Sequence, residues 1–420
     1  MIAPEDLPCP NGAPARYFGR VRAFIGVLAA CLFAACARVP PVPLPAPPPV
    51  TVAAIDASLG KAAAWLIERQ RPDGSFRSEA YAAFRDGYSL TPVVMKALAY
   101  SPSDPRAPEA YGRAAAFLAT MIGPEGKIGH LNYQVYTLSL AVLALNPSVD
   151  PSHHAFRQKL ADELRRHQLT EANGWLPEDV SFGGWGYWGQ VPVRPPPGAP
   201  IEELRSSNLP ATVTAVGALA MAGVPPADPA MVRARKFVER CQNLLPPERA
   251  DPLWDDGGFF FTPANEVQNK AMGGRDRHGA PRFRSYGTVT ADGVRALLRL
   301  GAGRDDPRVR AAAAWLERRF SPTEPPGAYP ELRAVQQASV RYYWAWTAAH
   351  ALRALGKDEL ETASGKVRWP EALARALMAE QRTDGSWTNT STDMREDDPL
   401  VSTPLAMAGL AIAKLVISTR

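Results

Sequence analysis

Residues 70–76 read QRPDGSF and residues 381–387 read QRTDGSW, and this turn motif decides the fold. Each copy follows an Ala-rich segment that ends in large apolar residues, and each precedes a more apolar segment. Looser copies of the Gly-centred turn lie at residues 125–126, 183–185, 256–259 and 327–329. A helix–turn–helix unit that recurs along a chain is the signature of a repeat architecture. The chain is therefore expected to be all-α and to contain six helical hairpins.

The first helices of four hairpins share a short phrase that is Ala-rich in three of them. It reads AAAWL at residues 62–66, AAAFL at 114–118 and AAAWL at 312–316, with a charged variant, ARKFV, at 234–238. Charged residues flank each phrase on the opposite stripe of the expected helix. One apolar and one charged face describe an amphipathic helix that packs on one side and meets solvent on the other.

The second helices are more apolar. Residues 212–222 (TVTAVGALAMA) and 403–413 (TPLAMAGLAIA) contain no charged residue, and a helix that is apolar on all sides is buried. A Thr followed by Leu seven residues later recurs in several of them, starting at Thr91, Thr212, Thr290 and Thr403. Inner apolar helices alternating with outer amphipathic ones predict a single (α/α)6 toroid over residues 53–417.

The first residues have the composition of an export segment. Basic residues at positions 16, 20 and 22 precede an apolar run at 23–35, which describes a signal peptide over residues 1–36. Small residues precede Cys31 and Cys36, so either cysteine is a candidate for lipidation in a bacterial lipoprotein signal. The alternative is ordinary secretion with no lipid. Residues 37–52 are rich in proline, which favours a semi-rigid spacer. The expected location is the periplasm or cell envelope, with a lipid holding the domain to a membrane.

Composition excludes several classes of partner. The formal net charge is +5 and no basic run is present, so no nucleic-acid partner is expected. Of the four cysteines, Cys241 alone lies in the folded body, and a single thiol cannot form an internal disulfide. The pair His153–His154 has no partner at metal-binding spacing. We expect neither a metal site nor a cofactor.

Beyond the two strict turns, three further stretches carry a family resemblance: FGGWGY at 182–187, SNLPAT at 207–212 and SYGTVT at 285–290. Together they resemble the terpenoid cyclase and protein prenyltransferase superfamily, in particular squalene-hopene cyclases and the exported bacterial prenyltransferase/squalene oxidase repeat proteins. The resemblance covers about residues 55–417. It implies the toroid fold and an apolar central cavity for an isoprenoid or other lipid-like ligand.

The chain departs from every catalytic pattern of that superfamily. Squalene-hopene cyclases protonate an alkene with a D-x-D-D motif, which is absent here. The pair Asp255–Asp256 belongs to a Gly turn and is interpreted as structural. Prenyltransferases bind zinc through Asp, Cys and His, and Cys241 has no such neighbours; the thioester motif of complement-type proteins is also missing. No catalytic set carries over residue by residue.

Two long insertions between helices are candidate mouth loops. One spans residues 185–207 and contains Trp185 and Trp188; the other spans 259–285, contains Arg275 and His278, and leads into Tyr286. Loops of this length are usually functional or disordered. They are either ligand-binding loops or solvated surface loops.

Further candidates lie on the expected inner helices. Asp292 either complements a helix dipole or, if it faces a cavity, has its pKa raised by burial and acts as an acid. Tyr342, Tyr343, Trp346 and His350 crowd the fifth inner helix, where Trp346 and His350 share a face. They form either an aromatic wall for an apolar ligand or plain core.

Three functions are compatible with these features. The first is an exported toroid that binds or acts on an isoprenoid or lipid-like ligand. The second is a non-catalytic envelope-binding or scaffold toroid. The third is a polysaccharide lyase that uses the basic stretch from Arg275 to Arg284 with Tyr286. A closed aromatic cavity favours the first, a filled interior the second, and an open basic groove the third.

Overall fold

The computed structural model describes residues 50–100, 104–146, 148 and 150–419. The predicted signal peptide, the lipidation candidates Cys31 and Cys36 and most of the Pro-rich linker lie outside the described residues. Within these ranges the chain forms 13 α-helices, four 3₁₀ turns and two antiparallel two-stranded hairpins.

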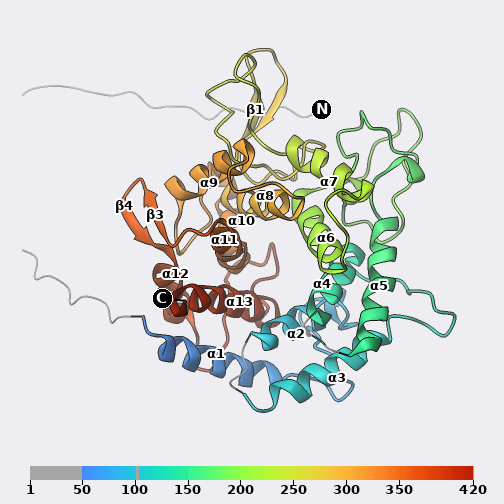
Figure 1. Ribbon diagram of the computed structural model, residues 1–420, viewed down its shortest axis with the longest axis vertical. Coiled ribbons are helices and arrows are strands. Elements are labelled where there is room, and N and C mark those ends of the chain that lie inside the picture. Colours follow the sequence, from blue (N-terminus) through green and yellow to red (C-terminus); the bar gives the residue numbers. More distant parts are fainter. Residues whose placement is uncertain (1–49, 101–103, 147, 149, 420) are drawn as a thin grey trace, which may run out of the picture. The chain divides into compact units, whose positions relative to one another are not determined.

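The apolar helices form an inner ring. Each packs on the next, and the last packs back on the first, so the ring is closed. Figure 1 shows these helices at the centre and the others around them. The inner helices are α2 (Thr91–Ala99), α4 (Gln134–Leu145), α6 (Leu209–Met221), α8 (Gly287–Arg299), α11 (Arg341–Leu355) and α13 (Pro399–Ser418). The prediction of an all-α toroid is confirmed.

The amphipathic helices surround this ring, each packed on an inner neighbour. Several begin with an Asp N-cap followed by Pro: the side chains of Asp150, Asp228 and Asp306 accept from a backbone N–H two residues further on. This arrangement satisfies a free N–H at the first turn. The outer helices are α1 (Val52–Ile67), α3 (Ala107–Ala119), α5 (Pro151–Arg166), α7 (Pro229–Arg240), α9 (Pro307–Arg319) and α12 (Trp369–Glu380), and a short α10 (Ala334–Ala338) precedes α11.

The recurring Gln and Thr of the sequence pattern hold neighbouring hairpins together. Nε2 of Gln70 donates to the carbonyl of Gly74 at 3.0 Å and to that of Ala110, on the next outer helix, at 2.7 Å. The aromatic residue of the turn, Phe76, donates its backbone N–H to Oγ1 of Thr91 at 2.9 Å. Each turn therefore joins an outer helix, an inner helix and the next outer helix.

The last turn uses the same contacts to close the ring. Nε2 of Gln381 donates to the carbonyls of Gly385 (2.8 Å) and Ser58 (2.9 Å), which ties the end of α12 to α1. Gly385 has φ +94°, and a Cβ at this position would lie 2.6 Å from the carbonyl oxygen of Lys61. Only glycine fits this close backbone approach without strain.

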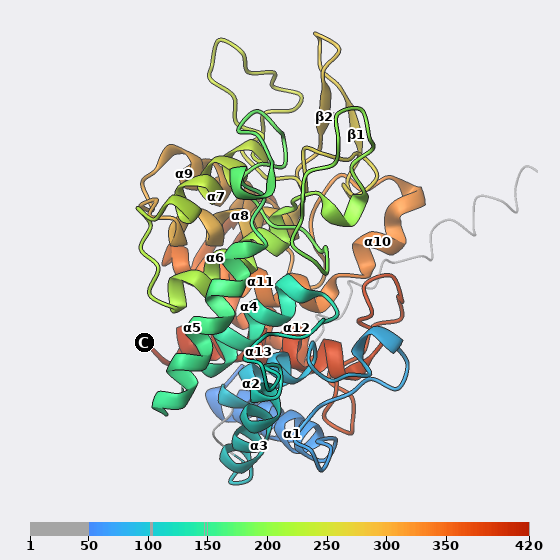
Figure 2. The same ribbon diagram turned by 90° about the vertical axis from the view of Figure 1, so that its right-hand side faces the viewer.

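Two hairpins interrupt the helices and were not predicted. Strands β1 (Gly273–Arg275) and β2 (Pro281–Phe283) lie in the second long insertion, and this hairpin projects beyond the ring of helices (Figure 2). Strands β3 (Glu359–Thr362) and β4 (Gly365–Arg368) precede α12. Each strand has three or four residues, too short to show a period-two pattern in the sequence.

Among the described residues, α13 is the one helix long and apolar enough to cross a membrane. Most of its surface is buried against α1, α2, α11 and α12. Its composition is explained by its place in the inner ring.

Candidate functional site

The inner helices enclose a cavity of about 400 Å³ near their N-terminal halves. Its wall is dominated by aromatic and aliphatic side chains, and every inner helix or the segment before it contributes. The lining residues include Phe84, Val93, Lys96, Tyr133, Tyr136, Leu140, Tyr187, Phe261, Lys270, Tyr286, Val289, Tyr343, Trp346, Asp393, Arg395, Glu396, Val401, Leu405 and Ala408. A concave, mostly apolar space with a few polar groups is the usual form of a small-molecule site.

Tyrosines form much of the aromatic wall. Tyr136 stacks on Tyr187 with ring centroids 5.6 Å apart, and Tyr343 meets Trp346 edge to face at 5.3 Å. The hydroxyl of Tyr286 is buried and has no hydrogen-bond partner among the described residues. Burial raises the pKa of Tyr136 to about 12, so this phenol remains protonated at neutral pH. The wall thus presents neutral aromatic faces to the cavity.

Asp292 lies behind this wall and is fully buried. Its Oδ2 accepts from the hydroxyl of Tyr343 at 2.7 Å, and its Oδ1 accepts from Oγ1 of Thr347 (2.5 Å) and from Nη1 of Arg295 (2.9 Å). Burial raises the pKa of Asp292, and Arg295 opposes that shift. Asp292 therefore reaches the cavity through Tyr343, and its role as an acid stays a prediction.

Lys96 places a cation on the wall of the apolar cavity. Its Nζ lies 5.5 Å from the ring centroid of Trp346. Burial, together with Arg295 and Arg299, lowers the pKa of Lys96 from 10.5 to about 7. A lone charge in an otherwise apolar helix is costly unless it serves a ligand or a partner.

Replacing Lys96 with Met is expected to remove a pH-dependent cost of folding. Between pH 7 and 10.5 the unfolded chain binds more protons at this side chain than the folded chain, so wild-type stability increases with pH across this window. The variant should therefore be more stable than wild type by about 3–5 kcal/mol at pH 6, and the difference should fall below about 1 kcal/mol near pH 10. Urea unfolding at pH 6, 8 and 10 measures it.

Lys236→Met is the matched control, because Lys236 lies exposed on the outer helix α7. It should change the free energy of unfolding by less than about 0.5 kcal/mol at each pH. A Lys96→Met variant with the same pH slope as wild type would contradict the assignment.

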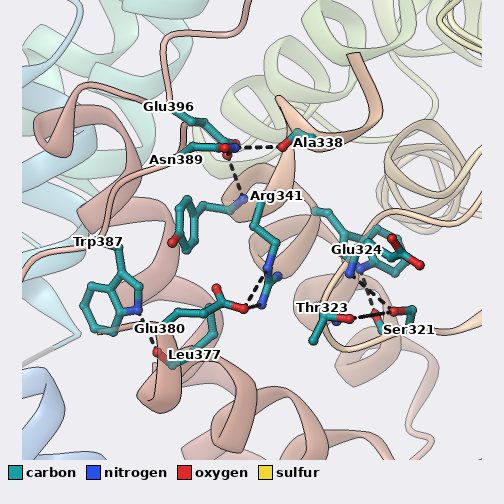
Figure 3. A network of polar contacts seen from close by, with 12 residues as sticks. Ser321, Thr323, Glu324, Ala338, Arg341, Leu377, Glu380, Trp387, Asn389 and Glu396 are labelled. Atoms are coloured by element: carbon teal, nitrogen blue, oxygen red, sulfur yellow. Dashed lines mark hydrogen bonds and ion pairs between the residues drawn. The ribbon is translucent and has the colours of Figure 1, made fainter. Parts of the chain in front are cut away.

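One side of the cavity is closed by the segment before α13. Both carboxylate oxygens of Glu396 accept backbone N–H groups at the start of α11, from Tyr342 at 2.9 Å and Tyr343 at 2.8 Å. Asn389 donates to Glu396 (3.1 Å) and to the carbonyl of Ala338 (2.7 Å), as Figure 3 shows. Burial raises the pKa of Glu396 to about 7. Glu396 thus caps α11 and fixes this segment over the cavity.

The two non-glycine residues with positive φ in the described chain meet at the cavity. They are Tyr133 (φ 48°) and Arg395 (φ 61°), and the guanidinium of Arg395 donates to the hydroxyl of Tyr133. Arg395 also lies over the rings of Tyr81, Phe84 and Tyr133, at 5.0–5.5 Å. Backbone strain of this kind clusters at functional sites.

Three residues predicted from the sequence line the cavity: Tyr286, Tyr343 and Trp346. His350 does not. It contacts Trp346, with ring centroids 5.8 Å apart, as their spacing predicted, but it lies in a separate pocket beside Arg353.

The other predicted ligand-binding residues lie away from the cavity lining. Tyr342 is buried, and its hydroxyl donates to the carbonyl of Thr388 at 3.2 Å. Trp185 is buried in the core, and its Nε1 donates to the carbonyl of Leu164. Trp188 packs under Arg205, with Cζ 4.6 Å from its ring. Arg275 and His278 are exposed on the β1–β2 hairpin, where Arg275 donates to the carbonyl of Gly279 at 2.7 Å. The structure does not bring these residues together.

Sequence reasoning missed several polar residues of the wall. Lys96 had a visible signal, because it is the one charge in the apolar segment TPVVMKALA. Glu396, Arg395 and Lys270 had none, because they lie in irregular segments whose path the sequence does not reveal. Within the described ranges no group of three or more His, Cys, Asp and Glu side chains could hold a metal ion.

Comparison with solved structures identifies the fold. The chain is similar to the type II terpene cyclase MstE from Scytonema, with 15% sequence identity over 87% of this chain and 99% of that chain and a TM-score of 0.51. It is also similar to an inactive variant of the α-1,6-mannanase GH76A of Salegentibacter sp. HEL1_6 in complex with α-1,6-mannotriose, with 12% identity over 86% and 99% of the two chains and a TM-score of 0.52. No protein-family model and no curated protein sequence matches the chain.

Identities this low establish a shared fold and leave the chemistry open. The closed ring of inner helices agrees with that comparison. The chain is an α/α toroid of the kind found in type II terpene cyclases and GH76 mannanases.

Proposed function

We propose that the toroid binds an isoprenoid or similarly extended apolar ligand in its central cavity. The observation that carries the proposal is the cavity of about 400 Å³ walled by tyrosine, phenylalanine, tryptophan and aliphatic side chains. Its volume falls within the range of about 300–1,000 Å³ that is usual for small-molecule sites. Removal of apolar ligand surface from water stabilises such a complex by about 25 cal/mol per Å².

The character of the wall favours this ligand class over the two alternatives. A scaffold would have an interior filled by its own side chains, whereas this interior leaves space. A polysaccharide site needs many paired hydrogen-bonding groups, because a buried polar group without a partner is costly. Apart from the hydroxyls of its tyrosine, serine and threonine residues, the polar groups of this wall lie at Lys96, Lys270 and the segment from Asp393 to Glu396. A single-residue variant of the type II terpene cyclase MstE, which shares the fold, has been solved in complex with the product merosterolic acid A, at 15% identity and a TM-score of 0.50.

Binding is better supported than alkene protonation. Both oxygens of Asp292 already accept hydrogen bonds, and Arg295 opposes the rise in the pKa of Asp292 that burial causes. Any proton transfer from Asp292 to the cavity would pass through Tyr343. The test compares turnover of bound ligand by wild type and by Asp292→Asn. This variant keeps the shape of the side chain and should leave ligand affinity unchanged.

A paired binding experiment tests the proposed function. Isothermal titration of the domain with geranylgeraniol should give a Kd at or below the micromolar range, and titration with α-1,6-mannotriose should give no heat beyond dilution. Trp346→Ala should weaken binding of the prenyl alcohol by at least tenfold, since an aromatic side chain that contacts a ligand contributes about 1.4 kcal/mol or more. Binding of the trisaccharide alone would overturn the proposal.

We further propose that the chain is exported and held at a membrane of the cell envelope by a lipid on Cys31 or Cys36. The basic, apolar and small-residue order of the first 36 residues supports this. Metabolic labelling with a fatty acid should mark the protein and should be lost in the Cys31→Ser, Cys36→Ser double variant. An unlabelled, freely released wild-type protein would indicate ordinary secretion.

A further inference from the structure

The inner helix α2 places one amine on the wall of the apolar cavity. Lys96 is the single charged residue of its segment, TPVVMKALA, and it lines the cavity together with Val93 and Ala97 of the same helix. Its Nζ lies 5.5 Å from the ring centroid of Trp346, which lines the cavity from α11. A primary amine is therefore available to whatever occupies a mainly apolar space.

Within the part of the chain that the structure describes, no carboxylate stabilises the ammonium form of Lys96. The charged groups that act on it are Arg295 and Arg299 of α8, and both are cations. On the α11 side, His350 contacts the Trp346 ring, and burial, then Lys96, lowers the pKa of this histidine. Burial and neighbouring positive charge both favour the uncharged amine at Lys96.

The second lysine of the wall, Lys270, has a different environment. Its Nζ lies 5.8 Å from the ring centroid of Phe261. Burial lowers the pKa of Lys270, but the carboxylate of Asp393, which also lines the cavity, opposes that shift. An opposite charge nearby favours the ammonium form. Lys96, whose charged neighbours are cations, is therefore the better nucleophile of the two.

An uncharged lysine in an apolar pocket is suited to one reaction in particular, addition to a carbonyl carbon. Since the pKa of Lys96 is lowered to about 7, roughly half of its side chains carry a neutral amine at neutral pH. An ordinary lysine, with a pKa near 10.4, presents the neutral amine about a thousandfold less often. The wall thus holds a reactive amine where water is scarce.

We propose that Lys96 forms a reversible Schiff base with a long-chain aldehyde held in the apolar cavity. Nζ adds to the aldehyde carbon, and the resulting carbinolamine loses water to leave a C=N bond. The oxygen of that water comes from the aldehyde and both hydrogens come from the amine, so no oxidant or reductant takes part. An apolar wall protects the imine, because water hydrolyses it. This inference rests on the function proposed above and names the reactive group of the ligand.

The competing explanation is that Lys96 only complements the dipole at the C-terminal end of α2, because it lies in the last turn of that helix. That role depends on a charged ammonium. Here burial beside two arginines removes much of the charge at neutral pH. The two explanations differ in whether the amine reacts with a bound aldehyde.

Reductive trapping tests the proposal. Wild-type protein incubated with geranylgeranial and cyanoborohydride at pH 7 should gain the mass of one geranylgeranyl group, and peptide mapping should place that group on Lys96. Lys96→Met should lower the yield of adduct at least about tenfold, because it removes the nucleophile. Excess geranylgeraniol should suppress the labelling of wild type to a similar extent, because the alcohol competes for the same cavity. Lys236→Met removes an exposed lysine of α7 and should keep the full yield.

A pH profile of the wild-type protein provides a second readout that needs no variant. The initial rate of labelling at Lys96 should reach half of its plateau near pH 7, where its amine loses the proton. Labelling of exposed lysines such as Lys236 should still be increasing at about pH 9, because their amines are almost wholly protonated below that pH.

The possible outcomes are distinguishable. If the protein binds geranylgeraniol but the adduct lies on Lys270 or on exposed lysines and not on Lys96, the Schiff base is wrong and the proposed function stands. Labelling of Lys96 that excess alcohol does not reduce would also overturn the inference, because the aldehyde would then react from outside the ligand site. A wild-type protein that does not bind geranylgeraniol would overturn the proposed function and, with it, the ligand named here.

Discussion

Gly385→Ala is expected to destabilise the toroid by about 3 kcal/mol or more. A residue with a Cβ is destabilised by about 1–2 kcal/mol at the positive φ of +94°. Its Cβ would also lie 2.6 Å from the carbonyl oxygen of Lys61 on α1, which is too close. The backbone must move apart at the contact where α12 meets α1 and the ring closes. Urea unfolding should show a large decrease in the midpoint, because the whole free energy of unfolding of a native protein is only about 5–15 kcal/mol.

Gly365→Ala separates the two parts of that cost. Gly365 lies at the β3–β4 turn with φ +113°, and no atom lies within 4 Å of the site of its missing Cβ. The free energy of unfolding of this variant should decrease by about 1 kcal/mol, because the positive φ is the one unfavourable feature there. Equal losses at the two glycines would show that the contact with Lys61 contributes nothing.

Val93→Trp is expected to abolish binding of an apolar ligand while the protein stays folded. Val93 lies on α2 with part of its side chain facing the cavity, so an indole at this position would occupy the space in which the ligand is proposed to bind. Affinity for geranylgeraniol should fall at least 100-fold, and the free energy of unfolding should change by less than about 1.5 kcal/mol because the indole fills empty volume. Titration calorimetry and urea unfolding of the same preparation measure both quantities.

Val232→Trp is the control for this variant. It makes the same substitution on the outer face of α7, where Val232 is 44% exposed, and it should leave affinity unchanged. Binding that survives in Val93→Trp and is lost in Val232→Trp would place the ligand outside the ring.

The fold could be predicted because its contacts are local and repeated. Gln70 and Gln381 make equivalent hydrogen bonds in their turns, and Thr91 and Thr403 each accept from the aromatic residue of the turn before them. Such contacts need the same residues at the same spacing, so the pattern is visible in the sequence. The β1–β2 and β3–β4 hairpins occur once each and left no repeated signal.

The candidate site was less predictable because its residues come from many elements. Tyr343 and Trp346 were found because aromatic residues crowd α11, and Tyr286 because it follows the long basic insertion. Trp185 belongs to the recurring Gly turn at 183–185, and its ring packs against α5, where its Nε1 donates to the carbonyl of Leu164.

The central claim is that the ring holds an apolar ligand, and lipid extraction tests it most directly. Wild-type protein and Val93→Trp should be purified from the native cell envelope under identical conditions, extracted with organic solvent and analysed by mass spectrometry. We expect a stoichiometric isoprenoid or other lipid-like molecule in the wild-type extract and its loss from the variant. A folded wild-type protein with an empty extract, or the same lipid recovered equally from both proteins, would contradict it.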